Sequence, residues 1–165
     1  MTKTDSSGQP GNTDGFKQAL QRAASLCSRK EHSSVEVRAK LKAWNVPESW
    51  IERILDRLIQ EKFVDDKRYA SLFVREKFRL NQWGRVKIAH QLRQHGIGEE
   101  TIQDALQEID VDAYTQTCAT LIRSKSVAIK DKNPFVRKGK ILRYVSGKGF
   151  ETDLIYRILN MNELD

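Results

Sequence analysis

The sequence has few cysteines and no long apolar run, and each shortage argues against a class of protein. Cys27 and Cys118 are its only cysteines, and they stand far apart with no CxxC pairing. This spacing fits reduced thiols packed as small core residues better than a disulfide framework. No apolar run is long enough for a signal peptide or a membrane span. We therefore expect a cytoplasmic protein without membrane contact.

The sequence also lacks a convergent set of catalytic or metal-binding residues. His90 and His95 are five residues apart on an expected helix, which places them on different faces, and His32 is remote. Gly147 and Gly149 form a GKG turn without the other glycines or the lysine-hydroxyl pair of a phosphate-binding loop. We expect no metal, no cofactor and no enzymatic activity.

What is present is the composition of a folded protein with a polar start. Of the 165 residues, 39% are hydrophobic, which lies in the ordinary globular range. Residues 1–15, MTKTDSSGQPGNTDG, contain no hydrophobic residue after Met1. Such a segment cannot bury enough surface to offset the entropy of ordering, so we predict a disordered tail over 1–15.

Apolar residues recur at helical spacing and no alternating strand pattern is present, which predicts an all-α fold. Ser33 and Glu36 have the spacing of a capping box at a helix start. Asp65 and Asp112 are placed to cap the helices that follow them, and Gly96 is placed to end a helix in the left-handed conformation.

An internal repeat runs through these helices. VRAKLKAWNVPESWIERIL (37–55) aligns without gaps with IAHQLRQHGIGEETIQDAL (88–106) and, more loosely, with ILRYVSGKGFETDLIYRIL (141–159). Five positions stay apolar in all three blocks: Val37, Ile88 and Ile141; Leu41, Leu92 and Val145; Val46, Ile97 and Phe150; Ile51, Ile102 and Ile155; Leu55, Leu106 and Leu159.

Each block follows another helical stretch, which predicts three tandem three-helix repeats over 16–66, 67–110 and 111–165. A unit of about fifty residues is marginal alone and gains burial by stacking on its neighbours, so we expect an elongated, curved array. The alternative is one compact bundle without a groove. Residues 126–140 make the third repeat longer, as an extended first helix, a mobile basic loop, or both.

Positive charge is concentrated in two windows of a chain whose net charge is +7. The window 75–95 has six basic residues against Glu76, and 123–148 has nine against Asp131. A solvated helix face is the plainer interpretation, but nine to one exceeds what solubility needs, and phosphate neutralisation is the commonest use of such asymmetry. The candidate binding residues are Arg75, Lys77, Arg79, Arg85, Lys87, Arg93, Arg123, Lys125, Lys130, Lys132, Arg137, Lys138, Lys140, Arg143 and Lys148.

One aromatic residue stands in a basic context. Trp83 lies in RLNQWGR, a polar connection between two basic helices, where an exposed ring could stack on a base or enter a partner's pocket. Packing is the favoured interpretation for Trp83, as for the other large aromatic residues at helical spacing.

Several stretches together resemble the RecX family. KEHSSVEV (30–37) is similar to its basic-x-x-Ser-x-x-Glu-Leu opening, and KFVDDKRYA (62–70) to its Gly-Leu-Leu-Asp-Asp-x-Arg-Phe-Ala signature, with Lys62 in place of glycine. WGRVKIAHQLRQHGI (83–97) resembles Gly-x-x-x-Ile-x-x-Glu-Leu-x-x-x-Gly-Ile, and KGKILRYVSGKGF (138–150) resembles the weaker last unit. The resemblance covers about residues 20 to 160.

The resemblance implies tandem three-helix repeats that modulate RecA, usually inhibiting it, by lodging in the groove of its filament on single- or double-stranded DNA. We expect a monomer whose basic windows meet acidic filament surface or DNA phosphate, with binding that weakens in salt. Five motif residues are assigned to structure, the last three at the joint between the first and second repeats: Ser33, Glu36, Asp65, Asp66 and Arg68.

The main alternative is a stand-alone DNA-binding protein of helix-turn-helix type. The third helices would begin PESW, GEET and ETDL, and their acidic residues would be repelled by phosphate. This argues against insertion of those helices into a major groove. An enzyme of nucleic-acid chemistry is the weaker alternative, because no catalytic set is present.

Overall fold

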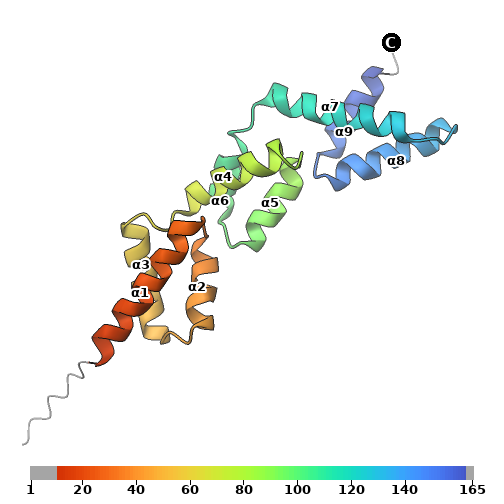
Figure 1. The fold of residues 1–165 in the computed structure, drawn as a ribbon. Coiled ribbons are helices and arrows are strands. Elements are labelled where there is room, and N and C mark those ends of the chain that lie inside the picture. The colour runs from red at the N-terminus through yellow and green to blue at the C-terminus, as the bar shows by residue number, and fades with distance from the viewer. Residues whose placement is uncertain (1–10, 163–165) are drawn as a thin grey trace, which may run out of the picture. The chain divides into compact units, whose positions relative to one another are not determined.

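The computed structural model describes residues 11–162, with side chains from Thr13 onwards. These residues form nine helices and no strand, so the all-α prediction is confirmed (Figure 1). None of these helices is long and apolar enough to cross a membrane. In chain order they are α1 (Gly11–Arg29), α2 (Ser34–Ala43), α3 (Glu48–Gln60), α4 (Asp66–Arg79), α5 (Arg85–Gln94), α6 (Glu99–Leu106), α7 (Val111–Ala128), α8 (Pro134–Gly147) and α9 (Thr152–Asn162).

The helices repeat in groups of three, and the aligned sequence blocks form the second and third helix of each group. Of the fifteen aligned apolar positions, all are buried except Val46, which is half-buried. Position by position, the apolar pattern in the sequence therefore marks the core-facing side of these helices.

The turn between the second and third helix is also the same in each group. Asn45, Gly96 and Gly149 occupy equivalent positions with φ of 58°, 77° and 99°. The next residue's N–H donates to a carbonyl five residues back, as in Val46 to Leu41 at 3.1 Å, and the same pattern follows Gly96 and Gly149. This bond satisfies a carbonyl at the helix end and requires the left-handed residue. The prediction for Gly96 is confirmed.

The first helix begins earlier than the sequence indicated. It starts at Gly11, so the predicted disordered tail over 1–15 is wrong for residues 11–15, and residues 1–10 lie outside the described part of the chain. Asp14 lies in the first turn, where a negative charge favours a helix. A Cβ built on Gly15 would lie 3.2 Å from the ring of Trp50, so α1 packs against α3 at this residue.

The chain divides into two compact units after Asp66. In the first, α1–α3 enclose a core that includes Cys27. In the second, α4–α9 share one continuous core that includes Cys118, whose thiol pKa burial raises to about 12. Both cysteines are buried and neither forms a disulfide, as predicted.

The motif residues assigned to structure lie at helix starts. The Ser33 hydroxyl accepts from the Glu36 N–H at 3.2 Å and the Glu36 carboxylate accepts from the Ser33 N–H at 3.1 Å, which confirms the capping box. Asp66 accepts from both the N–H and the hydroxyl of Ser34, each at 2.8 Å, and so ties the end of the first unit to the start of α2. Asp65 and Arg68 flank Asp66, and their role as a joint stays a prediction.

The cap of α7 differs from the prediction. Asp110, not Asp112, accepts from the Ala113 N–H at 2.9 Å, and Asp112 lies inside the first turn. The helix therefore starts at Val111, two residues earlier than a cap at Asp112 would place it. Over 126–140, α7 extends to Ala128 and a connection over 129–133 leads to α8, where Asn133 caps and Pro134 takes the first turn.

Candidate functional site

The basic residues of the second repeat divide between exposed positions and internal contacts. The ammonium of Lys87 lies 4.4 Å from the centre of the Trp83 ring, and that of Lys77 lies 5.4 Å from it. Trp83 is half-buried against the core of the second unit, which confirms packing as its main role. Contacts between an ammonium and an aromatic ring hold the lysine side chain in position and do not neutralise its charge.

Arg85 takes part in a polar network between the second and third repeats. Its backbone N–H donates to the Tyr114 hydroxyl at 3.0 Å, and its guanidinium lies 3.9 Å from the centre of the Tyr114 ring. The Tyr114 hydroxyl in turn donates to the Glu151 carboxylate at 2.9 Å, and Glu151 lies 3.9 Å from the Arg85 guanidinium. Burial raises the pKa of Tyr114 well above its usual range, so this hydroxyl stays protonated.

Arg93, Arg137 and Lys148 also have partners inside the protein. Arg93 binds both oxygens of Glu99 at 2.7 and 2.8 Å. Arg137 donates to the carbonyls of residues 126, 129 and 131, which holds the connection between α7 and α8 in place. The Lys148 ammonium donates to the carbonyl of residue 81 at 2.9 Å. For these residues the structure provides an internal role, and contact with a partner stays a prediction.

Arg75 and Arg79 are exposed on α4 and line a cavity of about 380 Å³. Glu108 and Asp110 line the same cavity, so its charge is balanced. This balance makes it a weak candidate for an anion site.

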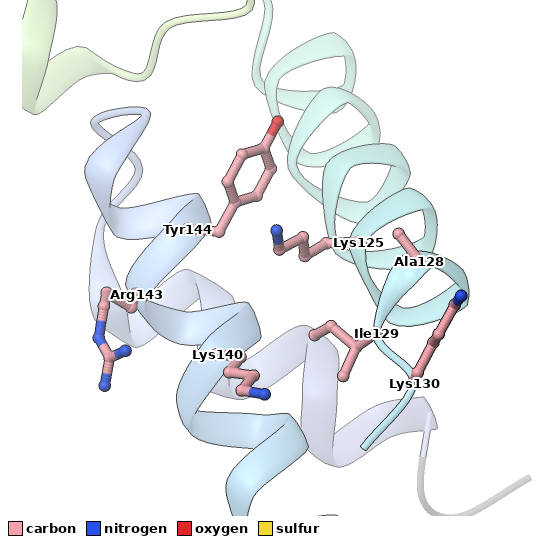
Figure 2. Close-up of a pocket in the computed structure, with 7 residues that line it drawn as sticks. All are labelled: Lys125, Ala128, Ile129, Lys130, Lys140, Arg143 and Tyr144. Carbon is pink, nitrogen blue, oxygen red and sulfur yellow. The ribbon is translucent and has the colours of Figure 1, made fainter.

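The third repeat brings basic residues together around one cavity without a carboxylate in its lining (Figure 2). The cavity has a volume of about 430 Å³ and lies between the end of α7 and the middle of α8. Its lining residues are Lys125, Ala128, Ile129, Lys130, Lys140, Arg143 and Tyr144. We call it the α7–α8 cavity. Of the predicted binding residues it gathers Lys125, Lys130, Lys140 and Arg143.

Within the α7–α8 cavity, Lys125 and Lys140 lie in the space between the two helices, whereas Arg143 extends away from α7 (Figure 2). The Lys125 ammonium lies 4.6 Å from the centre of the Tyr144 ring, and Tyr144 is 40% exposed. Lys140 pairs at 3.5 Å with Asp131, which is outside the lining. The hydrogen bond from the Asn133 N–H lowers the pKa of Asp131 most, and the positive charge of Lys140 lowers it further.

The remaining predicted residues do not join this cavity. Arg123 and Lys132 are exposed on α7 and on the connection after it, and Lys138 is half-buried on α8. Sequence reasoning missed Tyr144. A signal was present, because Tyr144 lies four residues after Lys140 on one helix, and residues four apart share a face.

What this arrangement can do is attract anions. Within residues 11–162, no three histidine, cysteine or carboxylate side chains converge on a metal site. The cations of the α7–α8 cavity have phosphate and carboxylate as natural partners, and the exposed ring beside them can meet a flat apolar group.

Comparison with known proteins places the chain in a family. The family model described as the first three-helix domain of RecX matches residues 19–58, and the model of the second three-helix domain matches residues 65–106. "Regulatory protein RecX" of Prosthecochloris aestuarii is 31% identical over 87% of this chain and 93% of its own length. The protein of the same name from Pseudomonas savastanoi pv. phaseolicola is 32% identical over 84% of this chain and 87% of its own length.

Solved structures agree with this assignment. A crystal structure of regulatory protein RecX is similar with a TM-score of 0.84 and 26% identity, over 91% of this chain and 74% of that one. The fold of RecX from Lactobacillus salivarius matches with a TM-score of 0.85 and 24% identity, over 93% and 99% of the two chains. With the repeat, the helix triplets and the relatives in agreement, this chain belongs to the RecX family of regulatory proteins.

Proposed function

We propose that this chain binds the RecA recombinase filament on DNA and lowers its recombinase and ATPase activity in recombination and DNA repair. It does so as a cytoplasmic monomer that catalyses no reaction itself. The observation that carries the proposal is family membership, established by relatives that this chain matches over most of their length. Regulation by binding needs a surface rather than an active site, and the helical repeats provide surface.

The charge of the third repeat supports a polyanionic partner. Residues 111–165 contain ten Lys or Arg against six Asp or Glu, and four of these cations surround the α7–α8 cavity. DNA phosphates and acidic protein surface both satisfy such a site, and both interactions weaken as salt screens the charges. A filament assembled on DNA offers both partners side by side.

Stand-alone DNA binding through the third helices is less well supported. Glu48, Glu99 and Asp153 lie in the first turns of α3, α6 and α9. A recognition helix enters the major groove near its N-terminus, where phosphate would repel these carboxylates. The basic side of α7 and α8 is therefore the better candidate for DNA contact.

The test compares binding of the full chain to bare DNA and to RecA-coated DNA along a salt gradient, with RecA ATPase measured in parallel. We expect tighter binding to the coated DNA, a loss of binding as salt rises, and a lower ATPase rate. A clear preference for bare DNA at every salt concentration would contradict the filament proposal and favour the stand-alone alternative.

A charge-reversal variant tests which surface acts. The triple variant Lys138→Glu, Lys140→Glu and Arg143→Glu should weaken inhibition of the ATPase. The matched control is Lys17→Glu, Lys40→Glu and Lys67→Glu, which changes the net charge equally at exposed positions outside the third repeat. Inhibition that is unchanged in the first triple variant would remove α8 from the mechanism.

A further inference from the structure

The α7–α8 cavity combines unbalanced positive charge with an exposed aromatic ring. Lys125, Lys130, Lys140 and Arg143 surround it, and no carboxylate lines it. Like charges held this close repel each other, so an anion bound among them relieves an unfavourable interaction. Asp131, which is outside the lining, pairs with Lys140 at 3.5 Å. The cavity is therefore prepared for a ligand that brings negative charge.

Tyr144 indicates which class of anion the cavity would bind. The Tyr144 ring is 40% exposed at the edge of the same cavity and is held near Lys125. A phosphate alone or a carboxylate side chain would use the cations and leave the ring unused. A nucleotide offers a phosphate and a flat base at adjacent positions, and bases stack on aromatic side chains in single-strand binding sites.

We propose that the α7–α8 cavity binds one nucleotide unit of a single strand of nucleic acid. The base stacks on Tyr144, and its phosphate lies between Lys125 and Lys140. The volume of about 430 Å³ falls in the range of small-ligand sites and suits one nucleotide rather than a duplex. In a duplex the bases are stacked on each other, so Tyr144 cannot reach a base face.

The internal contacts of α8 support this geometry. Arg137 fixes the connection over residues 129–133 through three carbonyls, so the end of α7 and the start of α8 are held in a set position. Lys125 on α7 and Lys140 on α8 therefore line the cavity from two helices before any ligand arrives, and preorganised donors bind with less loss of entropy. On binding, Lys140 is shared between the phosphate and Asp131.

This inference rests on the proposed function, because it identifies the contact with DNA that a filament regulator would make. Its test uses no recombinase. Fluorescence anisotropy of the full chain measures binding to a labelled oligothymidine strand, to a duplex hairpin of equal charge and to a labelled mononucleotide. The variants are Tyr144→Leu, Tyr144→Phe, Lys125→Gln and Lys140→Gln. The matched controls are Tyr156→Leu and Arg157→Gln on α9, where both side chains are exposed.

We expect Tyr144→Leu to raise the Kd for the single strand about tenfold and to leave the hairpin unchanged, because one stacked base is lost. Tyr144→Phe should retain binding, since the ring is kept. Lys125→Gln and Lys140→Gln should each make the negative slope of log K against log salt less steep, by at most about 0.7, the value for the one single-strand phosphate that both lysines contact. The controls should match the wild type.

Three results would overturn the inference: a Tyr144→Leu effect no larger than that of Tyr156→Leu, an equal loss on the hairpin, or a mononucleotide that binds as tightly as the strand. The third would make a free nucleotide the ligand. Failure here with RecA inhibition intact would leave the proposed function standing. Single-strand binding through Tyr144 without any effect on RecA would instead contradict the proposed function.

Discussion

Lys62 follows Glu61, the C-cap of α3, and has φ of 62°, a left-handed conformation that residues with a Cβ adopt at a cost. The conformation is needed because the Phe63 N–H donates to the Leu58 carbonyl at 2.9 Å, which closes the helix end. The RecX signature that this stretch resembles has glycine at the position. Glycine at this position of the signature is thus favoured by backbone geometry and not by side-chain chemistry.

Lys62→Gly should therefore stabilise the first unit, by about 0.5 to 1 kcal/mol, the strain relieved less the greater entropy of glycine in the unfolded chain. Urea unfolding followed by circular dichroism measures the change. Lys40→Gly, inside α2, serves as the control and should destabilise by about 1 kcal/mol, because glycine is unfavourable in a helix interior. Destabilisation by both substitutions would mean that the Lys62 side chain contributes more than its strained backbone costs.

Tyr114 provides a second prediction at this scale. Its side chain is 1% exposed, and its hydroxyl accepts from the Arg85 N–H and donates to Glu151. Tyr114→Phe keeps the ring and leaves these two groups without that partner, at a cost of about 1 to 3 kcal/mol. Thermal and urea unfolding measure the loss. Tyr156→Phe removes an exposed hydroxyl and should change little; equal effects of the two substitutions would show that the network adds nothing.

At the scale of elements, α5 and α6 are joined by a two-bond ion pair. The hydrogen bonds from the Arg93 guanidinium, and after them one from the Gln103 amide, lower the pKa of Glu99 to about 2, against 4.5 ordinarily. Because the pKa is lower in the folded state, the pair adds stability above about pH 4.5 and loses it as the pH falls from 4.5 towards 2.

NMR titration of the Glu99 carboxyl carbon should thus give a pKa near 2 in the wild type and a value closer to 4.5 in Arg93→Gln. The variant should also lose less stability than the wild type between pH 4.5 and 2, since the folded and unfolded pKa values then converge. The pair is exposed, so the effect on stability should be small. A Glu99 pKa unchanged by the substitution would contradict this cause.

Helices and their buried faces could be predicted from the sequence because periodicity is a local signal. The turns at Asn45, Gly96 and Gly149 are equally local, and only the glycines are obvious from residue type. The start of α1 could not be predicted in this way, since Gly15 near that start lies against Trp50, which is remote in sequence. The residue types of a segment do not reveal a tertiary contact of this kind, although the contact orders the segment.

The candidate site could also be predicted only in part, because its contacts join residues that are remote in sequence. A charge window identifies basic residues but not their partners, and Lys148 contacts the backbone of residue 81, 67 positions away. Arg85 and Arg137 likewise have internal partners that become adjacent only in the fold. Lys125 and Lys140 belong to the same window and have a cavity between them. Charge alone could not separate these two groups, because the distinction depends on which helix faces meet.

At the scale of the molecule, the second unit is held together by a close backbone contact between its two repeats. The Gly84 N–H donates to the Lys148 carbonyl at 2.8 Å, and the Val86 N–H donates to the Gly149 carbonyl at 3.0 Å. A Cβ on Gly84 would lie 2.3 Å from the carbonyl carbon of Gly149. Only glycine allows the start of α5 to approach the turn between α8 and α9 this closely.

Gly84→Ala should separate these backbones and weaken the shared core of α4–α9 by about 1 to 3 kcal/mol, the usual cost of overpacking. Gly139→Ala, where a Cβ meets open space, is the control.

In hydrogen exchange, the amides of α7–α9 should lose protection before those of α4–α6 in Gly84→Ala and together with them in the control. If the two basic windows act on one filament, the loosened variant should also inhibit RecA less while its α7–α8 cavity still binds a single strand. Exchange that remains concerted in Gly84→Ala would mean that the aromatic core around Tyr114 and Phe150, rather than this backbone contact, couples the two repeats.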